Sequence, residues 1–359
     1  MVELWIVFAV VAALVIGGAI YQHVAATRQA RSLPAPGQFI DVGGHRLHVH
    51  CVGRGDVAVV FESGIAASSV SWALVQPRVG AFARACVYDR AGLAWSDAAS
   101  CPRTFARIVD EFASVVAHAA PTSPLVLVGH SFGTFVVQAY AAREAGRVAG
   151  LVLVDPPVEW LSPTPQRARL LRGGRQLSRI GAALARVGIV RASLALLTGG
   201  APAAPRQFSK VFGPTAAQTL ERLVGEVRKL PPELYPVVQS HWSQPKCFSA
   251  MADYLQTLAD ESRAIASIRS PADVAVVVIS GGHQPAERVT LQRAFAARGL
   301  DGTHIVAEHS GHWVQFDQPE IIVDAVQQLA RSPRRRSLLV RDANARYRTA
   351  PNPPEPRKV

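Results

Sequence analysis

The sequence predicts an α/β protein with a doubly wound, mostly parallel sheet, an inserted helical lid and an N-terminal transmembrane helix. Three observations lead to this prediction. An uncharged apolar run opens the chain, short apolar runs then alternate with longer amphipathic ones, and this alternation stops between residues 157 and 271. Alternating strands and helices are typical of a parallel sheet covered on both faces. The 359 residues suffice for one large domain with an insertion, or for two small domains.

The N-terminal apolar run covers residues 4–20 and is at the short end of what crosses a bilayer as a helix. Trp5 and Tyr21 stand near its ends, where amphipathic rings favour the membrane interface. We therefore predict a retained membrane anchor. A cleaved signal peptide, with a weak small-residue site at residues 24–26, and a buried core helix are the alternatives.

The side of the membrane is predicted from charge and from cysteine usage. Arg28 and Arg31 follow the apolar run and no basic side chain precedes it, so the positive-inside rule places the remaining chain in the cytoplasm. The four cysteines show no C-x-x-C spacing, so neither a disulfide scaffold nor a structural zinc module is expected: they are Cys51, Cys86, Cys101 and Cys247. Unpaired cysteines would also fit the cytoplasm, and a secreted or periplasmic domain is the alternative.

The strands are predicted from short runs rich in β-branched residues and leucine, as in strands buried on both faces. They cover residues 45–51, 57–61, 84–88, 125–129, 150–154, 274–279 and 303–307. Amphipathic spacing predicts helices over residues 104–119, 132–144, 286–298 and 318–331. The last helix has a clear start signal, because Pro319 and Glu320 follow Asp317.

The break in the alternation predicts an inserted helical lid or subdomain. Apolar residues recur there at helical spacing with arginines between them, at Leu170, Leu177, Ile180, Leu184 and Val187. The favoured interpretation is a helix packed on the core with a solvated basic face, and the alternative is a basic amphipathic surface against the membrane. The predicted divisions are residues 1–32 (anchor and linker), 33–156 and 272–332 (core), 157–271 (lid) and 333–359 (a disordered tail).

The net charge of +12 is concentrated in two segments. Residues 331–359 contain nine basic and two acidic side chains, and residues 160–220 contain nine basic and no acidic ones. The rest of the chain is slightly acidic. No nucleic-acid-binding motif accompanies these segments, so we expect membrane lipids, and no nucleic acid, as their partners.

A nucleophile elbow is predicted at residues 129–133, which read Gly-His-Ser-Phe-Gly. This G-x-S-x-G pattern directly follows an apolar strand and precedes an amphipathic helix, which is the context that the motif requires. A sharp strand-to-helix turn exposes the central Ser131 hydroxyl above the helix N-terminus, where the helix dipole favours negative charge. Ser131 is therefore the candidate nucleophile.

A serine nucleophile needs a base, which we expect late in the chain, after the last strand. His309 and His312 compete for this role. His312 is favoured because Gly311 before it allows a tight loop, whereas His309 directly follows the strand and suits a structural role.

Residues 38–331 resemble the α/β-hydrolase superfamily, in the branch with a helical lid after strand six. The resemblance is carried by Glu62-Ser63-Gly64-Ile65, by residues 88–97 (YDRAGLAWSD), by the elbow, by residues 151–156 (LVLVDP) and by residues 310–320 (SGHWVQFDQPE). It implies an oxyanion hole made by the backbone N–H groups of Phe132 and Ile65. Many members carry His-Gly where this chain has Ser63-Gly64, a change that leaves the backbone donors intact. The Asp89-Arg90 turn is interpreted as structural.

The acid of the triad is the member that departs from the family pattern. The family usually places it in the loop after strand seven, where this chain has Gln284, which cannot carry the charge. Asp155, at the end of strand six, is the favoured replacement, although an Asp before Pro156 could simply fix a turn. Glu287 is the alternative acid, and a site without an acid remains open. Asp273 lies at the wrong end of its strand, and His283 is interpreted as a loop residue.

These residues predict a membrane-anchored serine hydrolase that cleaves a carboxylic ester, small or lipid-like, without cofactor or metal. A serine nucleophile argues against the dehalogenases and epoxide hydrolases of this fold, which use aspartate there. The alternatives are an amidase or peptidase, a C–C hydrolase, an acyltransferase or a haloperoxidase using the same triad, and a non-catalytic ligand-binding protein on this scaffold.

Overall fold

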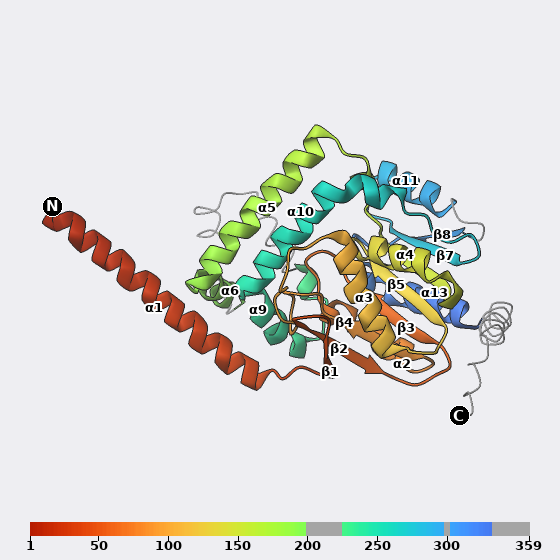
Figure 1. Ribbon diagram of the computed structural model, residues 1–359, viewed down its shortest axis with the longest axis horizontal. Coiled ribbons are helices and arrows are strands. Elements are labelled where there is room, and N and C mark those ends of the chain that lie inside the picture. Colours follow the sequence, from red (N-terminus) through yellow and green to blue (C-terminus); the bar gives the residue numbers. More distant parts are fainter. Residues whose placement is uncertain (199–224, 298–301, 332–359) are drawn as a thin grey trace, which may run out of the picture.

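The fold is described from a computed structural model, which covers residues 1–198, 225–297 and 302–331. Its centre is an eight-stranded sheet in the order β1-β2-β4-β3-β5-β6-β7-β8 (Figure 1). The strands are β1 (Gln38–Asp41), β2 (Arg46–Val52), β3 (Ala58–Glu62), β4 (Arg84–Tyr88), β5 (Leu125–His130), β6 (Val148–Val154), β7 (Ala275–Gly281) and β8 (Gly302–Ala307). The pairs β1–β2 and β2–β4 are antiparallel and the other five pairs are parallel, which confirms the predicted mostly parallel sheet.

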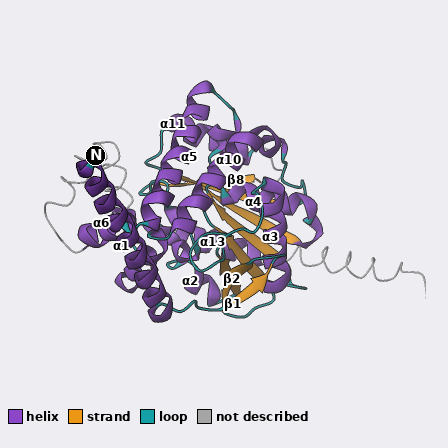
Figure 2. Cartoon of the chain, turned by 60° about the vertical axis from the view of Figure 1, so that its left-hand side comes forward, coloured by secondary structure: helices purple, strands orange, loops and turns teal. Residues whose placement is uncertain are grey.

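Helices cover both faces of the sheet (Figure 2). On one face lie α3 (Phe105–Ala119), α4 (Gly133–Arg143) and α11 (Ala286–Ala296), and on the other lie α2 (Gln76–Gly80) and α13 (Pro319–Arg331). Alternate residues of β5 pack into the two layers, Leu125 and Leu127 into one and Val126 and Val128 into the other. This double burial explains why the central strands are continuously apolar.

The predicted elements agree with the structure to within two residues at each end, for all seven strands and all four helices. The sequence analysis missed β1, because this four-residue edge strand is largely exposed and lacks an apolar run. It also underestimated α1 (Val2–Ser32), which continues as a helix well beyond the apolar run.

In the described residues between β6 and β7, the secondary-structure elements are helices joined by short loops. Its longer helices are α5 (Pro165–Arg186), α6 (Ile189–Thr198), α9 (Tyr235–Trp242) and α10 (Pro245–Ser267), which we call the insertion helices. Helix α5 packs antiparallel on α10, with Gly174 beside Leu255 and Gly181 beside Phe248. A Cβ atom on Gly181 would lie 2.5 Å from the Phe248 ring, so a small residue is required there. The predicted disordered tail, residues 333–359, lies outside the described residues.

Helix α1 projects away from the body of the molecule (Figure 1). It is long and apolar enough to cross a membrane, and none of its most apolar window is buried. A signal sequence near an N-terminus would have the same composition, so the helix agrees with the predicted anchor without excluding cleavage.

The expectation of unpaired cysteines is wrong for one pair, because Cys51 and Cys86 form a disulfide. These residues face each other across the antiparallel pair β2–β4. Their separation of 35 residues in the sequence gives no hint of this, since only the sheet topology brings the two strands together. Cys101 and Cys247 are free. The disulfide removes one argument for the cytoplasmic side, because such bonds persist in oxidising compartments.

We expect the double variant Cys51→Ser/Cys86→Ser to lose about 3–4 kcal/mol of unfolding free energy, the amount associated with a closed loop of this length. Urea denaturation of the protein measures this loss, and Cys101→Ser is the matched control that should leave stability unchanged. Thiol alkylation of freshly lysed cells gives a second measurement. Protection of Cys51 and Cys86 supports an oxidising compartment, whereas their full alkylation contradicts it.

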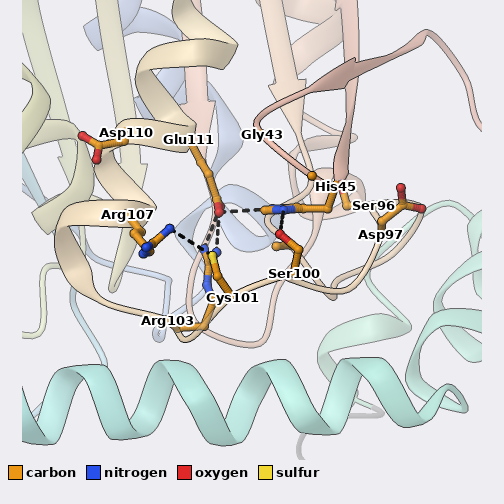
Figure 3. Close-up of polar contacts among 12 residues, drawn as sticks. Gly43, His45, Ser96, Asp97, Ser100, Cys101, Arg103, Arg107, Asp110 and Glu111 are labelled. Atoms are coloured by element: carbon orange, nitrogen blue, oxygen red, sulfur yellow. Dashed lines mark hydrogen bonds and ion pairs between the residues drawn. The ribbon is translucent and has the colours of Figure 1, made fainter.

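A group of polar and charged side chains connects the loop after β4 to α3 and to His45, directly before β2 (Figure 3). Arg103 donates two hydrogen bonds to the carboxylate of Glu111, and both side chains are buried. His45 lies between Glu111 and Ser100, with Nε2 3.2 Å from Glu111 Oε1 and Nδ1 3.2 Å from Ser100 Oγ. Because the buried charges compensate each other, we interpret this cluster as structural.

Because His241 is buried, we expect the free energy of unfolding to fall on mild acidification. Burial, with smaller electrostatic contributions, lowers the pKa of His241 to about 4, and the ring lies against Trp95. In the unfolded chain a histidine titrates near 6.5, so the unfolded state alone gains this proton as the pH falls from about 6.5 to 4. His241→Gln should therefore reduce the pH slope of stability by about 1.4 kcal/mol per pH unit, measured by denaturation at several pH values. The exposed His118→Gln should leave the slope unchanged.

Candidate active site

The elbow between β5 and α4 forms as its glycines predict. Ser131 has a φ of +52°, a left-handed conformation that few non-glycine residues adopt. A Cβ atom on Gly129 would lie 2.7 Å from the Gly133 carbonyl oxygen, and one on Gly133 would lie 2.5 Å from the Glu62 carbonyl oxygen. Only glycine lets these backbones cross so closely, and the crossing holds the serine at the turn.

Ser131 is held by backbone contacts at the carboxyl edge of the sheet. Its N–H donates to the Val154 carbonyl at 2.9 Å, and the Thr134 hydroxyl donates to its carbonyl at 2.6 Å. The side chain is half-buried. The predicted nucleophile therefore sits at the edge where the carboxyl ends of β5 and β6 meet, which is where ligands bind in open α/β sheets.

The structure brings His312 and Asp155 together. His312 Nδ1 lies 2.5 Å from Asp155 Oδ2, and the carboxylate is fully buried. Asp155 also has a left-handed φ of +42°, and its N–H donates to the Ile279 carbonyl at 2.7 Å. Among the described residues, the carboxylate contacts distant side chains and no local N–H group, so the alternative that Asp155 only fixes a turn is not supported, and the bend at Asp155 directs the carboxylate toward His312.

The competing candidates lie elsewhere. Glu287 is exposed in the first turn of α11, away from the His312 ring nitrogen that Asp155 contacts. His309 is exposed after β8, and its backbone N–H donates to the Gln318 side chain. Of the alternatives left open by the sequence, the arrangement around Asp155 and His312 is the one that the geometry supports.

Three side chains that the sequence analysis did not assign hold the Asp155 carboxylate. Gln284 and Gln292 donate hydrogen bonds to it at 3.1 and 2.8 Å, and a guanidinium nitrogen of Arg288 lies 3.2 Å away. Burial raises the pKa of Asp155, but the hydrogen bond with His312 and the charge of Arg288 outweigh it and hold the pKa below its ordinary value. For Arg288 and Gln292 the available signal was their spacing of four residues, which places them on one face of α11, whereas Gln284 lies in the loop before this helix.

His130 supports the histidine loop as a neutral ring. Its Nε2 lies 2.8 Å from the His312 carbonyl oxygen, and the two rings are 4.6 Å apart between centres. Burial and the neighbouring His312 lower the pKa of His130 to about 3. His130 therefore carries no charge at neutral pH, which leaves His312 free to accept a proton without a second cation beside it.

The two predicted oxyanion donors are available. In the described part of the chain, the N–H groups of Ile65 and Phe132 have no protein acceptor. The loop that carries Ile65 lies against the nucleophile, since a Cβ atom on Gly64 would be 3.4 Å from Ser131 Cβ. Two unpaired N–H groups beside a serine can stabilise negative charge on a tetrahedral intermediate.

Arg90 fixes the shape of this oxyanion loop, which agrees with the structural role predicted for the Asp89-Arg90 turn. Its guanidinium donates to the carbonyl oxygens of Ser63, at 2.6 Å, and of Gly64, and it pairs with the buried Glu62 carboxylate. It also lies 5.5 Å from the centre of the Phe132 ring. One buried cation thus contacts both sides of the oxyanion hole.

We expect Arg90→Met to destabilise the protein by about 3–5 kcal/mol, because it leaves Glu62 buried without its partner. Urea denaturation measures this loss. The matched control is Arg46→Met, which removes an arginine from an exposed pair with Asp97 and should leave the unfolding free energy nearly unchanged. Equal costs for the two variants would contradict the role assigned to Arg90.

An apolar cleft lies beside the oxyanion loop. Its walls include Ala66 and Val70 from the loop after β3, Leu230, Trp242 of α9, and Trp313 and Phe316 next to His312. The rings of Trp313 and Phe316 are stacked with centres 5.2 Å apart. The cleft suits an apolar group more than a charged one. No group of metal-ligating side chains occurs among the residues that the structure describes.

A left-handed serine at a strand-to-helix turn, an Asp-His pair at the same edge of the sheet and a mostly parallel sheet are typical of α/β hydrolases. The sequence profile of the alpha/beta hydrolase family matches residues 59–325, and this chain belongs to that family. Curated relatives are an uncharacterised protein of Schizosaccharomyces pombe (36% identity over 81 residues) and YqjL of Bacillus subtilis (32% over 111 residues). The matches cover 23% and 30% of this chain, and 15% and 42% of those proteins.

Solved structures agree with the fold. A thermophilic esterase from Thermogutta terrifontis has a TM-score of 0.54 and 19% identity, over 82% of this chain and 98% of that one. The enol-lactonase from Burkholderia xenovorans has a TM-score of 0.55 and 15% identity, over 82% of this chain and 100% of that one. At such identities the likeness concerns the fold alone.

Proposed function

We propose that this protein is a membrane-anchored serine hydrolase that cleaves a carboxylic ester through an acyl-enzyme. The observation that carries the proposal is the contact between His312 and Asp155 at the sheet edge where Ser131 occupies the elbow. Membership of the alpha/beta hydrolase family supports hydrolase activity. The serine triad and the ester substrate are our inference from this geometry.

In the proposed reaction, Ser131 Oγ attacks the ester carbonyl carbon while His312 Nε2 accepts the hydroxyl proton. Asp155 orients the ring through Nδ1 and stabilises the imidazolium. The N–H groups of Phe132 and Ile65 receive the oxyanion, which then collapses as the C–O bond breaks and His312 protonates the leaving alcohol. Water, deprotonated by His312, attacks the acyl-enzyme in the same manner and releases the acid and Ser131.

The apolar cleft supports an ester with an apolar acyl or alkyl group. Trp242, Trp313 and Phe316 present ring surface there, and Trp313 directly follows His312 in the chain. We further propose that α1 retains the protein at the membrane and that the insertion helices act as the lid. An amphiphilic, lipid-like ester is therefore the substrate class that we favour, and membrane lipids are the proposed partners.

A fluorophosphonate probe tests the proposal, since it reacts only with activated serines. The full chain in detergent micelles should be labelled on a single peptide containing Ser131, and it should hydrolyse p-nitrophenyl esters of medium chain length faster than the acetate. Folded protein that resists the probe and hydrolyses none of these esters would refute the serine-hydrolase proposal.

A further inference from the structure

Helix α1 is bound to the insertion helices by buried polar contacts. Gln22 is buried, although the apolar helix before it is exposed. Its amide donates to the Ser243 carbonyl at 3.1 Å and accepts from Arg191 Nε at 2.8 Å, and Arg191 also donates to Gln29. A flexible tether would not bury such groups, so α1 is a docked element of the structure.

The docking contact is backbone to backbone. A Cβ atom on Gly18 would lie 2.3 Å from the Val187 carbonyl oxygen, at the junction between α5 and α6. On the other side of the contact, a Cβ atom on Gly188 would lie 2.8 Å from the Tyr21 ring. The adjacent Gly17, in contrast, faces open space with nothing within 4 Å. Gly18 is thus specifically shaped for this contact.

The docking point coincides with the expected membrane boundary. Residues 2–17 of α1 precede Gly18, and at 1.5 Å per residue they span about 24 Å, somewhat less than the hydrocarbon layer of about 30 Å. Tyr21 and Gln22 follow at the interface. Both views of the molecule place α6 beside α1 (Figures 1 and 2), so an α1 that spans the bilayer would bring the α5–α6 junction to the membrane surface.

The insertion helices present apolar side chains there. In Figure 1, α5 runs crosswise to α1 from this junction, which would lay it along the membrane plane. Leu170, Leu177 and Ile180 lie on one side of α5 and are 65%, 64% and 46% exposed. Exposed arginines follow another side of the helix: Arg172, Arg179 and Arg186. Residues 160–220 contain no acidic side chain.

We propose that α5 and α6 rest on the bilayer surface, with the apolar residues of α5 inserted among the lipids and the docked α1 holding them in place. An interfacial helix buries such a stripe at the boundary between headgroups and acyl chains, while Arg172, Arg179 and Arg186, on the opposite side of α5, face water. The second part of the inference rests on the proposed function: the site takes its ester from the bilayer, because α9 joins the docked insertion to the apolar cleft through Trp242.

Photocrosslinking tests the docking without requiring activity. The full chain, with a diazirine amino acid at Leu177, is reconstituted into vesicles of phosphatidylcholine and phosphatidylglycerol and irradiated. Leu291 on α11 is the matched control, because it is also an exposed leucine (41%) and lies outside α1 and the insertion. We expect lipid adducts at Leu177 and not at Leu291. Equal adduct yields at the two positions would overturn the proposal.

The adjacent glycines provide the second test. Gly18→Leu should block docking, whereas Gly17→Leu makes the same apolar change in open space. We expect Gly18→Leu alone to reduce lipid adducts at Leu177 on the order of tenfold, as expected when two linked binding elements are uncoupled. It should also slow hydrolysis of a long-chain ester in the vesicles while leaving a water-soluble acetate ester unaffected.

The outcomes separate the two proposals. Lipid adducts at Leu177 without hydrolysis of either ester would retain the docking and refute the proposed function. If Gly17→Leu and Gly18→Leu hydrolyse the long-chain ester at equal rates, and the acetate ester at equal rates, the proposed hydrolase is retained and delivery of the substrate from the bilayer is overturned.

Discussion

Ser131→Ala is expected to lower kcat/KM for ester hydrolysis by about 10⁴-fold or more, because it removes the only group placed to form the acyl-enzyme. The loss should appear in kcat, since the apolar cleft and the oxyanion loop remain to bind substrate. The fold should stay intact, because alanine is smaller than serine and keeps the same Cβ atom at this left-handed position. Circular dichroism and the midpoint of thermal unfolding measure this.

The matched control is Ser267→Ala, which removes an exposed serine hydroxyl at the end of α10. We expect it to retain wild-type rates. The loss of kcat/KM in His312→Ala should equal that in Ser131→Ala within about tenfold. The double variant should lose little more than either single variant, because a nucleophile and its base act as one unit. Substantial hydrolysis by the Ser131 variant would assign the activity to another group.

Asp155→Asn is the second large effect that we expect, with a loss of kcat/KM on the order of 10³- to 10⁴-fold. Asparagine preserves the size of the side chain but cannot stabilise the imidazolium that forms on His312. Its amide also presents a donor where His312 Nδ1–H needs an acceptor, which favours the wrong orientation or tautomer. Steady-state kinetics with a soluble ester measure the loss.

Glu287→Gln is the control for this variant, because it neutralises the competing carboxylate on α11. We expect rates within about twofold of the wild type, as for a surface substitution away from the site. A large loss in Glu287→Gln together with a retained rate in Asp155→Asn would reverse our assignment of the acid.

Much of the fold could be predicted because it depends on local patterns. The alternation of Leu and Val along β5 and the amphipathic spacing of α13 are properties of neighbouring residues, and each is satisfied within its own element. The same holds for the elbow, where Gly129 and Gly133 flank Ser131 and dictate a tight crossing wherever the turn lies. The edge strand β1 was missed because an exposed four-residue segment carries no such pattern.

The identity of the acid could not be decided by local patterns. Asp155 and Glu287 both follow strands that end at the same sheet edge, so the sequence places both within the same region as a histidine from the last loop. Our proposal of Asp155 rests on its contact with His312 and on Gln284, Arg288 and Gln292, which hold its carboxylate there. These contacts join residues more than 120 positions apart in the sequence.

The sequence by itself therefore determined the sheet, its covering helices, the elbow with Ser131 and the apolar N-terminal helix, and it predicted His312 as the base. Only the tertiary structure decided the partner of His312, the Cys51–Cys86 disulfide and the docking of α1 through Gln22 and Arg191. The physical reason is the same in each case. Periodicity and turn chemistry are set by residues close in the chain, whereas an ion pair, a disulfide or a buried hydrogen bond depends on where distant backbones meet.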